Sequence, residues 1–472
     1  NETHKKVLQA LRQADYLSPK YHVVIANPPY MGSKGMNGRL GAWIKDKYPD
    51  SKSDLMTCFM ERCTGLSKQN GYWGMIDLPS WMFLSSFEKF RKKLIKNQII
   101  TSLLHLGRGI FGSDFGAVAF SIRNMRPHVA SVGIYRRLFE KHVDVRRPEV
   151  IEQKFLKSDD GFFQFTQSQF QQIPGSPIAY WLSDAILRGF TDGAAISSIG
   201  RVLVGLQTGD NERFIRKWHE TSFSNIRLNS NSGHWVPYVK GGEYRKWYGN
   251  RDLILDWSND GAAIISHPSA RPQNRDAYFR RGITYTNVSS GAFSARYIDG
   301  EGIFDQKGSM IFTDFDSDLN TIIAILLSKV GTRYLEILCP TIDFNPGSVG
   351  QVPILQRGSS EITEHTLRLI GLSKSDWNSY EISWDFANLP LLNSNHLQPT
   401  LKATYQKLRA HWWEMTLEMQ RLEQENNRIF IDAYGLQDEL TPDVPLNEIT
   451  LTCNPHYRYG NDKSEDELEA LL

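Results

Sequence analysis

The tetrapeptide Asn27-Pro28-Pro29-Tyr30 combines the residue types in this sequence that are best suited to chemistry. An amine on an aromatic ring has a delocalised lone pair, so a protein that modifies the amine must hold its two hydrogens with acceptors. The Asn27 side-chain oxygen and the Pro28 carbonyl can do this, because two successive prolines form a stiff loop without N–H donors. Tyr30 then offers a flat face for a base. The tetrapeptide therefore points to methyl transfer onto an exocyclic amine.

An apolar run at residues 21–26, Tyr-His-Val-Val-Ile-Ala, directly precedes the tetrapeptide. Short apolar runs bounded by Pro are typical of central parallel strands. Open α/β sheets bind ligands at the carboxyl ends of such strands, so this is where a site is expected. The alternative is a Pro-Pro turn that only ends a buried strand.

Several segments follow in an order that resembles the N6-adenine DNA methyltransferases. Residues 26–30 resemble the catalytic motif of that family, residues 53–62 the helix after it, residues 71–79 the next strand and residues 80–84 the segment beyond. The resemblance implies S-adenosylmethionine as the cofactor and an adenine flipped out of double-stranded DNA as the acceptor. The catalytic residues that it implies are Asn27, Pro28, Pro29 and Tyr30. Asn27 and Pro28 would also border the cofactor.

A glycine-rich segment at residues 107–116 contains two aromatic residues, Phe111 and Phe115. In the family that the chain resembles, an aromatic side chain from the corresponding loop packs against the second face of the flipped base. Tyr30 with Phe111 or Phe115 would then offset the cost of unstacking that base. The alternative for the glycines is a plain turn.

Two later segments, residues 239–250 and 377–386, resemble the PglX family, the methyltransferases of bacteriophage exclusion (BREX) systems. This likeness runs through nearly the whole chain. It implies modification of host DNA that is coupled to defence against phage, with the other subunits of a defence complex as partners.

One departure from the family concerns the cofactor. The family binds S-adenosylmethionine through a Gly-rich turn after its first strand, upstream of the catalytic motif. None of the twenty residues before Tyr21 fits such a turn. We therefore expect a fragment of a larger protein, with the rest of the cofactor pocket upstream of this chain.

Composition is that of a large globular protein, with 472 residues, 40% hydrophobic and 22% charged. No stretch has the 18 or so uninterrupted apolar residues of a membrane span, and the first fifteen residues are too polar for a signal peptide. We expect a cytoplasmic protein that does not contact membranes. The four cysteines show neither a metal-ligand spacing nor a disulfide framework, and we expect no metal.

The expected fold class is α/β. Residues 1–150 alternate apolar runs with helical patterns and would form the C-terminal half of the sheet of a Rossmann-like S-adenosylmethionine-dependent methyltransferase. Residues 151–190 would be a connector, residues 191–358 a mixed α/β target-recognition domain that binds DNA, and residues 359–472 a helical C-terminal region. Strands are predicted at residues 23–26, 73–78, 99–106 and 117–123.

Charge is distributed unevenly along the chain, although the net charge is only +2. Residues 195–281 carry thirteen Lys or Arg against eight Asp or Glu, whereas residues 401–472 carry seven against fourteen. The middle is therefore the part expected to meet phosphates. The candidate DNA contacts there are Lys240, Arg245, Lys246, Arg213, Arg216, Arg275 and Arg280. For each Arg, an ion-paired or solvated surface position is an alternative, and core packing is an alternative for the aromatics beside Lys240.

The resulting prediction is a site-specific adenine N6 methyltransferase of DNA. Protein or small-molecule amine methyltransferases can carry the same tetrapeptide, but they would not need a basic, aromatic domain after it. A DNA-binding or scaffold subunit without turnover of its own is the other alternative.

Overall fold

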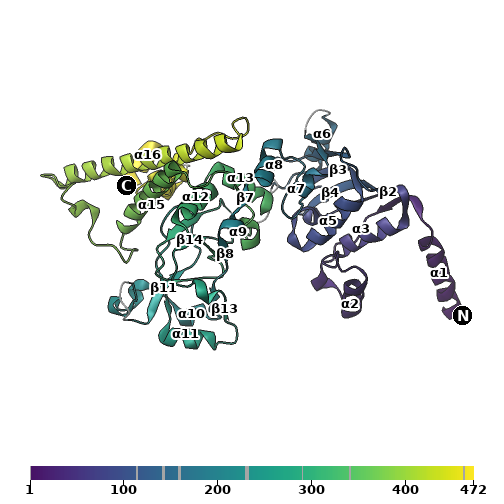
Figure 1. The fold of residues 1–472 in the computed structure, drawn as a ribbon, viewed down its shortest axis with the longest axis horizontal. Helices are drawn as coiled ribbons and strands as arrows, with labels where there is room; N and C mark the ends of the chain where they lie inside the picture. Colours follow the sequence, from purple (N-terminus) through teal and green to yellow (C-terminus); the bar gives the residue numbers. More distant parts are fainter. Residues whose placement is uncertain are drawn as a thin grey trace. The chain divides into compact units, whose positions relative to one another are not determined.

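The structure is a computed structural model that describes residues 2–112, 115–140, 144–157, 161–228, 233–289, 291–339, 342–460 and 463–471. The chain divides into two compact units, Asn1–Leu187 and Arg188–Leu472 (Figure 1). Each unit is described by itself.

The first unit is built on a six-stranded sheet with the strand order β1-β2-β4-β3-β5-β6. Its strands are β1 (Tyr21–Ala26), β2 (Ser67–Asp77), β3 (Ile99–Arg108), β4 (Gly116–Arg123), β5 (Val132–Arg137) and β6 (Phe162–Thr166). Its helices are α1 (Glu2–Leu17), α2 (Gly38–Lys47), α3 (Leu55–Leu66), α4 (Ser80–Phe83), α5 (Glu88–Asn97), α6 (Pro148–Leu156) and α7 (Gln169–Gln172), and α8 (Asp184–Asp192) leads into the second unit.

The sheet is mixed, whereas the sequence pattern predicted a parallel one. β1 pairs with β2 and β3 pairs with β5 in parallel, but β4 is antiparallel to both β2 and β3. The reason is that β3 and β4 form a hairpin, and this hairpin places β4 between β2 and β3. The four predicted strands are all observed, as β1 to β4.

Helices α3 and α5 pack beside the sheet through apolar faces (Figure 1). Met56 and Met60 of α3 and Phe90 and Leu94 of α5 are buried. β1 is the first strand in the order of the described sheet and is contacted by α3, but its Val23 and Ile25 are 57% and 82% exposed. β1 therefore lies at the edge of the sheet that the described residues form, with apolar side chains facing solvent.

The expected connector at residues 151–190 lies largely within the first unit. β6 pairs antiparallel with β5 along its whole length, and Ile151 of α6 joins a core cluster with Leu106, Ala117 and Leu138. Contacts divide the chain after Leu187 and place residues 188–472 in one unit. In this structure the recognition and helical regions expected from the sequence thus form a single compact unit.

The second unit holds two four-stranded sheets, with the orders β10-β12-β11-β16 and β15-β14-β17-β8, and two short strand pairs, β13-β9 and β18-β7. Its strands are β7 (Ala194–Ala195), β8 (Arg201–Leu203), β9 (Leu206–Gln207), β10 (Ile215–Lys217), β11 (Trp235–Val239), β12 (Leu253–Asp256), β13 (Arg271–Pro272), β14 (Gly282–Tyr285), β15 (Ala295–Ile298), β16 (Ile303–Phe304), β17 (Met310–Phe312) and β18 (Pro353–Ile354). Its helices are α9 (Ile196–Ile199), α10 (Asn211–Phe214), α11 (Ser258–Ile265), α12 (Asp316–Leu326), α13 (Lys329–Leu338), α14 (Pro346–Val349), α15 (Ser360–Asn378), α16 (Leu401–Tyr434), α17 (Pro455–Tyr459) and α18 (Glu465–Leu471).

Helix α16 is the longest element of the second unit (Figure 1). Thr400 caps its start by accepting the Ala403 N–H, and Gly435 ends it with a φ of 65°. The helix packs on α12, α13 and α15 of the same unit, and its Leu408, Met419 and Leu422 are buried. None of the helices in the described ranges has the length and apolar character needed to span a membrane.

Candidate functional site

The tetrapeptide lies at the carboxyl end of β1. The last register pair of β1 is Ala26 with Met75 of β2, and residues 27–30 then leave the sheet as an irregular loop. Pro28 is buried, Asn27 and Pro29 are exposed, and Tyr30 is half-buried. The buried proline anchors the loop while the amide of Asn27 remains accessible.

Asn27 and Pro28 supply two hydrogen-bond acceptors in this loop. Among the described residues, no donor reaches the Asn27 side chain or the Pro28 carbonyl. Since Pro28 and Pro29 have no N–H of their own, the loop does not consume these acceptors internally. The loop therefore carries two acceptors that no donor among the described residues occupies.

Tyr30 and the predicted aromatic residues of the β3–β4 loop are brought together. The rings of Tyr30 and Phe115 pack edge to face, with centroids 5.9 Å apart and an interplanar angle of 78°. Phe111 lies 6.2 Å from Phe115, and both phenylalanines are substantially exposed. A base held between two rings requires nearly parallel faces, so Phe115 would have to rotate away from this edge contact to cover a base.

Glycine is required at one point of that loop. Gly109 has a φ of +105°, and a Cβ there would lie 1.9 Å from the Arg146 carbonyl oxygen. The close backbone approach explains one of the glycines that the sequence pattern singled out. Ser113 and Asp114 lie outside the described residues.

A buried acid that the sequence analysis did not single out lies at the end of β2. Asp77 has no exposed surface, and its Oδ1 accepts the indole N–H of Trp81 at 3.0 Å. Among the described residues its Oδ2 has no partner. Burial raises the pKa of the Asp77 carboxyl well above its ordinary value; the Trp81 bond lowers it and the Asp54 charge raises it further. The sequence signal was an acid at the end of an otherwise apolar strand.

Asp77 adjoins the tetrapeptide through Tyr30. The Tyr30 hydroxyl donates to the carbonyl of Ile76, the residue before Asp77, at 3.4 Å. Burial, and next the Asp77 charge, raise the pKa of Tyr30. The phenol is therefore neutral at physiological pH, and Asp77 lies close enough to Tyr30 to affect its ionisation.

The structure revises two of the predicted DNA contacts, Arg245 and Lys246. Each is only 4% exposed. Arg245 donates to Asp376 of α15 at 2.8 Å, and Lys246 pairs with Glu423 of α16. Burial alone would lower the pKa of Lys246, but the Glu423 carboxylate outweighs it and raises the pKa. Both cations neutralise buried carboxylates, so neither reaches a phosphate in this structure.

The other predicted cations lie at or near the surface. Arg213, Arg275 and Arg280 are exposed, and Lys240 and Arg216 are half-buried. Arg213 and Arg216 lie on the segment after β9, and Arg275 and Arg280 lie on the segment after β13. These two segments are joined by the pairing of β13 with β9 and by a 2.9 Å hydrogen bond from the Asn274 side chain to the Val204 carbonyl. The structure therefore places these segments side by side.

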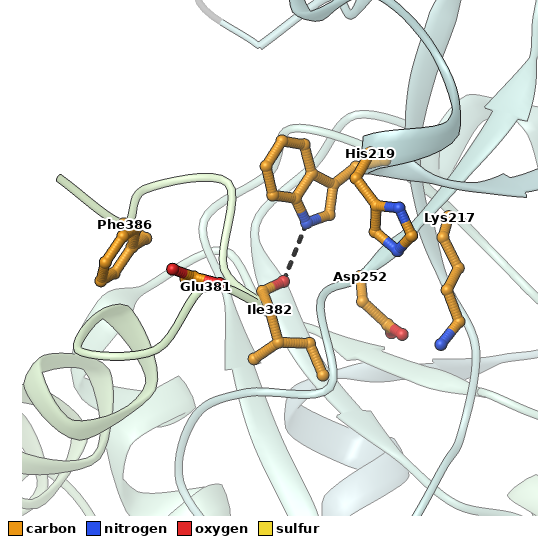
Figure 2. A pocket seen from close by; sticks show the side chains of 7 residues that line it. Lys217, His219, Asp252, Glu381, Ile382 and Phe386 are labelled. Carbon is orange, nitrogen blue, oxygen red and sulfur yellow. Dashed lines mark hydrogen bonds between the residues drawn. The ribbon is translucent and has the colours of Figure 1, made fainter. Parts of the chain in front are cut away.

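A hollow of about 550 Å³ lies elsewhere in the second unit (Figure 2). Its lining residues are Lys217, Trp218, His219, Asp252, Glu381, Ile382 and Phe386. The Trp218 indole donates to the Ile382 carbonyl at 2.9 Å, which holds the segment after α15 against the short 3₁₀ turn that follows β10. Across the residues that the structure describes, no three His, Cys, Asp or Glu side chains converge in a way that could hold a metal ion.

Known proteins resemble this chain in sequence and in fold. Residues 2–111 match the family described as Eco57I restriction-modification methylase. The structure of the Type IIL restriction-modification enzyme MmeI in complex with DNA superposes with a TM-score of 0.50 at 11% identity, covering 89% of this chain and 55% of MmeI. The mixed α/β fold is thus shared with a restriction-modification enzyme.

Two curated proteins are more similar to the chain in sequence. Adenine-specific methyltransferase BrxX of Escherichia coli O9:H4 (strain HS) is 35% identical over 473 residues, which is 98% of this chain and 38% of BrxX. Adenine-specific methyltransferase PglX of Lacticaseibacillus casei (strain Zhang) is 37% identical over 467 residues, which is 93% of this chain and 38% of PglX. The resemblance predicted from the sequence is confirmed: the chain is a relative of these adenine-specific methyltransferases. It spans about 38% of their length.

Proposed function

We propose that this chain is part of a site-specific DNA methyltransferase that transfers a methyl group from S-adenosylmethionine to the N6 amine of an adenine flipped out of the duplex. The observation that carries the proposal is the pair of acceptors, Asn27 and Pro28, at the carboxyl end of β1 beside Tyr30, which no donor among the described residues reaches. The names of the two curated relatives support the same activity.

The proposed roles follow from the site. The Asn27 side-chain oxygen and the Pro28 carbonyl accept the two N6 hydrogens and draw the nitrogen toward a tetrahedral geometry, which localises its lone pair. Tyr30 stacks on the adenine, and Phe115 or Phe111 closes over the other face once the edge contact with Tyr30 opens. Bound S-adenosylmethionine would supply the methyl group, its sulfur keeping the bonding electrons, and one N6 proton would leave to water.

Only part of a cofactor site is present in the described residues. When bound, S-adenosylmethionine supplies an electrophilic methyl group. Asn27 and Pro28 would fit the side of that site which faces the acceptor, because none of the described residues donates to their oxygens at the end of β1. The open edge of β1, with Val23 and Ile25 exposed, supports the proposal that protein outside the described residues completes the pocket.

We propose that DNA phosphates are met by the accessible cations of the second unit. These are Lys240, Arg213, Arg216, Arg275 and Arg280. Arg245 and Lys246 are left out because they are buried in ion pairs. By the resemblance to the PglX family, the modification would mark host DNA for a phage-defence complex with further subunits.

The central experiment replaces Asn27 by Ala in the full-length protein. We expect loss of N6-methyladenine in the DNA product, measured by mass spectrometry, with DNA affinity within threefold of wild type. Asn37→Ala is a matched control, since Asn37 is exposed and only caps α2. Full methylation by the Asn27→Ala protein would refute the role of Asn27 in methyl transfer. The role would also be refuted if Asn37→Ala lost methylation while Asn27→Ala kept it.

A further inference from the structure

The segment that follows the tetrapeptide is tied to the start of α3. The Met31 N–H donates to Asp54 Oδ1 at 3.2 Å, and the Leu55 N–H donates to the Met31 carbonyl at 3.0 Å. Gly32 and Asp54 form an antiparallel bridge. The chain thus leaves the sheet at Ala26 and is captured again by α3 directly after Tyr30.

Asp54 makes this tie with the same oxygen that caps the helix. Its Oδ1 also accepts the N–H of Met56 at 3.0 Å, which satisfies one of the free donors of the first helical turn. Helix α3 is itself fixed on the sheet, since Met56, Met60 and Cys63 are buried. One carboxylate oxygen therefore joins a fixed helix to the first residue after the tetrapeptide.

The tetrapeptide is consequently held at both ends. Before it, Ala26 is paired in the sheet with Met75; after it, Met31 is bonded to Asp54 and Leu55. Only four residues lie between these anchors, and two of them are prolines with fixed φ. The positions of the Asn27 amide and the Pro28 carbonyl then depend on both anchors.

From this geometry we propose that Asp54 is a positioning residue for methyl transfer, acting through the backbone of Met31 on the acceptors of the tetrapeptide. The proposal rests on the function proposed above. A reacting group that is misplaced by about 1 Å loses roughly a hundredfold in rate. Loss of the Asp54 tie should therefore lower turnover more than it lowers DNA binding.

The test compares Asp54→Ala and Asp54→Asn in the full-length protein, with S-adenosylmethionine and unmethylated bacterial DNA. We expect kcat to fall about 10- to 100-fold for Asp54→Ala, with KM for DNA within about threefold of wild type. Asparagine keeps a side-chain oxygen that accepts both N–H groups, so Asp54→Asn should retain kcat within about threefold.

The matched control is again Asn37→Ala. Asn37 caps α2 by accepting the Leu40 N–H at 2.9 Å, so its loss removes a helix cap of the same kind. The described residues show no hydrogen bond between Asn37 and residues 27–31. We expect wild-type kcat for this variant. An equal fall in kcat for Asn37→Ala and Asp54→Ala would overturn the proposal, because it would show that general loss of helix stability is enough.

Hydrogen–deuterium exchange gives a readout that does not depend on turnover. We expect faster exchange of the peptide that covers residues 27–33 in Asp54→Ala, and wild-type exchange there in Asp54→Asn and Asn37→Ala. Unchanged exchange in Asp54→Ala, or a kcat of Asp54→Asn as low as that of Asp54→Ala, would overturn the proposal. A wild-type protein that methylates no adenine would instead refute the proposed function, while the exchange result still reports on the tie.

Discussion

Replacing Arg245 by Ala separates a structural role of this residue from the DNA contact that the sequence suggested. Its guanidinium donates to the Tyr248 carbonyl at 2.8 Å, to Thr452 Oγ1 at 2.9 Å and to Asp376 Oδ2 at 2.8 Å. Its removal leaves the Asp376 carboxylate, which is also buried, without a counter-ion. Breaking a buried ion pair in this way costs about 3–5 kcal/mol.

The magnitude should lie near the lower end of that range. Asp376 keeps two backbone donors after the substitution, the N–H groups of Thr452 at 2.7 Å and Cys453 at 2.9 Å. With a urea dependence of about 3 kcal/mol per M, a loss of about 3 kcal/mol lowers the unfolding midpoint of the second unit by about 1 M. Lys240→Ala, at a half-buried position without a described ion pair, should change the free energy of unfolding by about 0.5 kcal/mol or less.

The assay is urea unfolding followed by tryptophan fluorescence, with DNA affinity measured on the same proteins. Lys240→Ala should weaken DNA binding and reduce the logarithmic salt dependence by about one unit. The double variant R245M/D376N should recover part of the lost stability, because it removes both charges together while the asparagine oxygen still accepts one of the two backbone N–H groups. An unchanged unfolding midpoint for Arg245→Ala with a clear loss of DNA affinity would refute the structural reading and restore Arg245 as a DNA contact.

Three further predictions concern the first unit. Asp77→Asn should stabilise the protein above about pH 4, and asparagine keeps an acceptor for Trp81. Because folding raises the pKa of Asp77, the protein loses stability as the pH rises above the unfolded-state pKa near 3.9. A stability difference between Asp77→Asn and wild type that is the same at pH 4 and pH 7 in denaturant titrations would contradict this. Tyr30→Ala should raise KM for DNA about 5- to 150-fold, since stacking one base contributes about 1–3 kcal/mol, whereas Tyr30→Phe should not. Equal kinetics of Tyr30→Ala and wild type would argue against stacking. Gly109→Ala should lower the free energy of unfolding by more than the about 1–2 kcal/mol of a positive φ alone, because the new Cβ meets the Arg146 carbonyl. Gly112→Ala, which has a positive φ but open space around it, should lower it by no more than that amount. Equal thermal stabilities of the two variants would show that the backbone at Arg146 moves aside at little cost.

The sequence was most informative where local chemistry decides the structure. The apolar run before Asn27 predicted a strand, which is observed as β1. The family resemblance singled out Phe111 and Phe115 as aromatics for a base, and Phe115 contacts Tyr30. Asp54 also had a local signal, since an Asp directly before an apolar helix is a typical N-cap. Its second bond, to Met31, could not be predicted, because it depends on where α3 packs.

The sequence failed where long-range packing decides. Lys240, Arg245 and Lys246 look alike in a basic, aromatic segment, yet only Lys240 avoids burial. The ion-pair partner of Arg245 is Asp376, 131 residues away along the chain, and that of Lys246 is Glu423, 177 residues away. The same limit applies to β4, whose place between β2 and β3 follows from tertiary pairing rather than from any pattern in its own residues.

The two ion pairs that join residues 245 and 246 to α15 and α16 bear on how segments of the second unit could be exchanged between relatives. A chimaera that received residues 191–358 alone would place Arg245 and Lys246 against helices of the recipient protein. The carboxylates of the recipient at the positions of Asp376 and Glu423 would then lack their own cations. Chimaeras should therefore be joined near Leu187 and carry the helices along with the sheets.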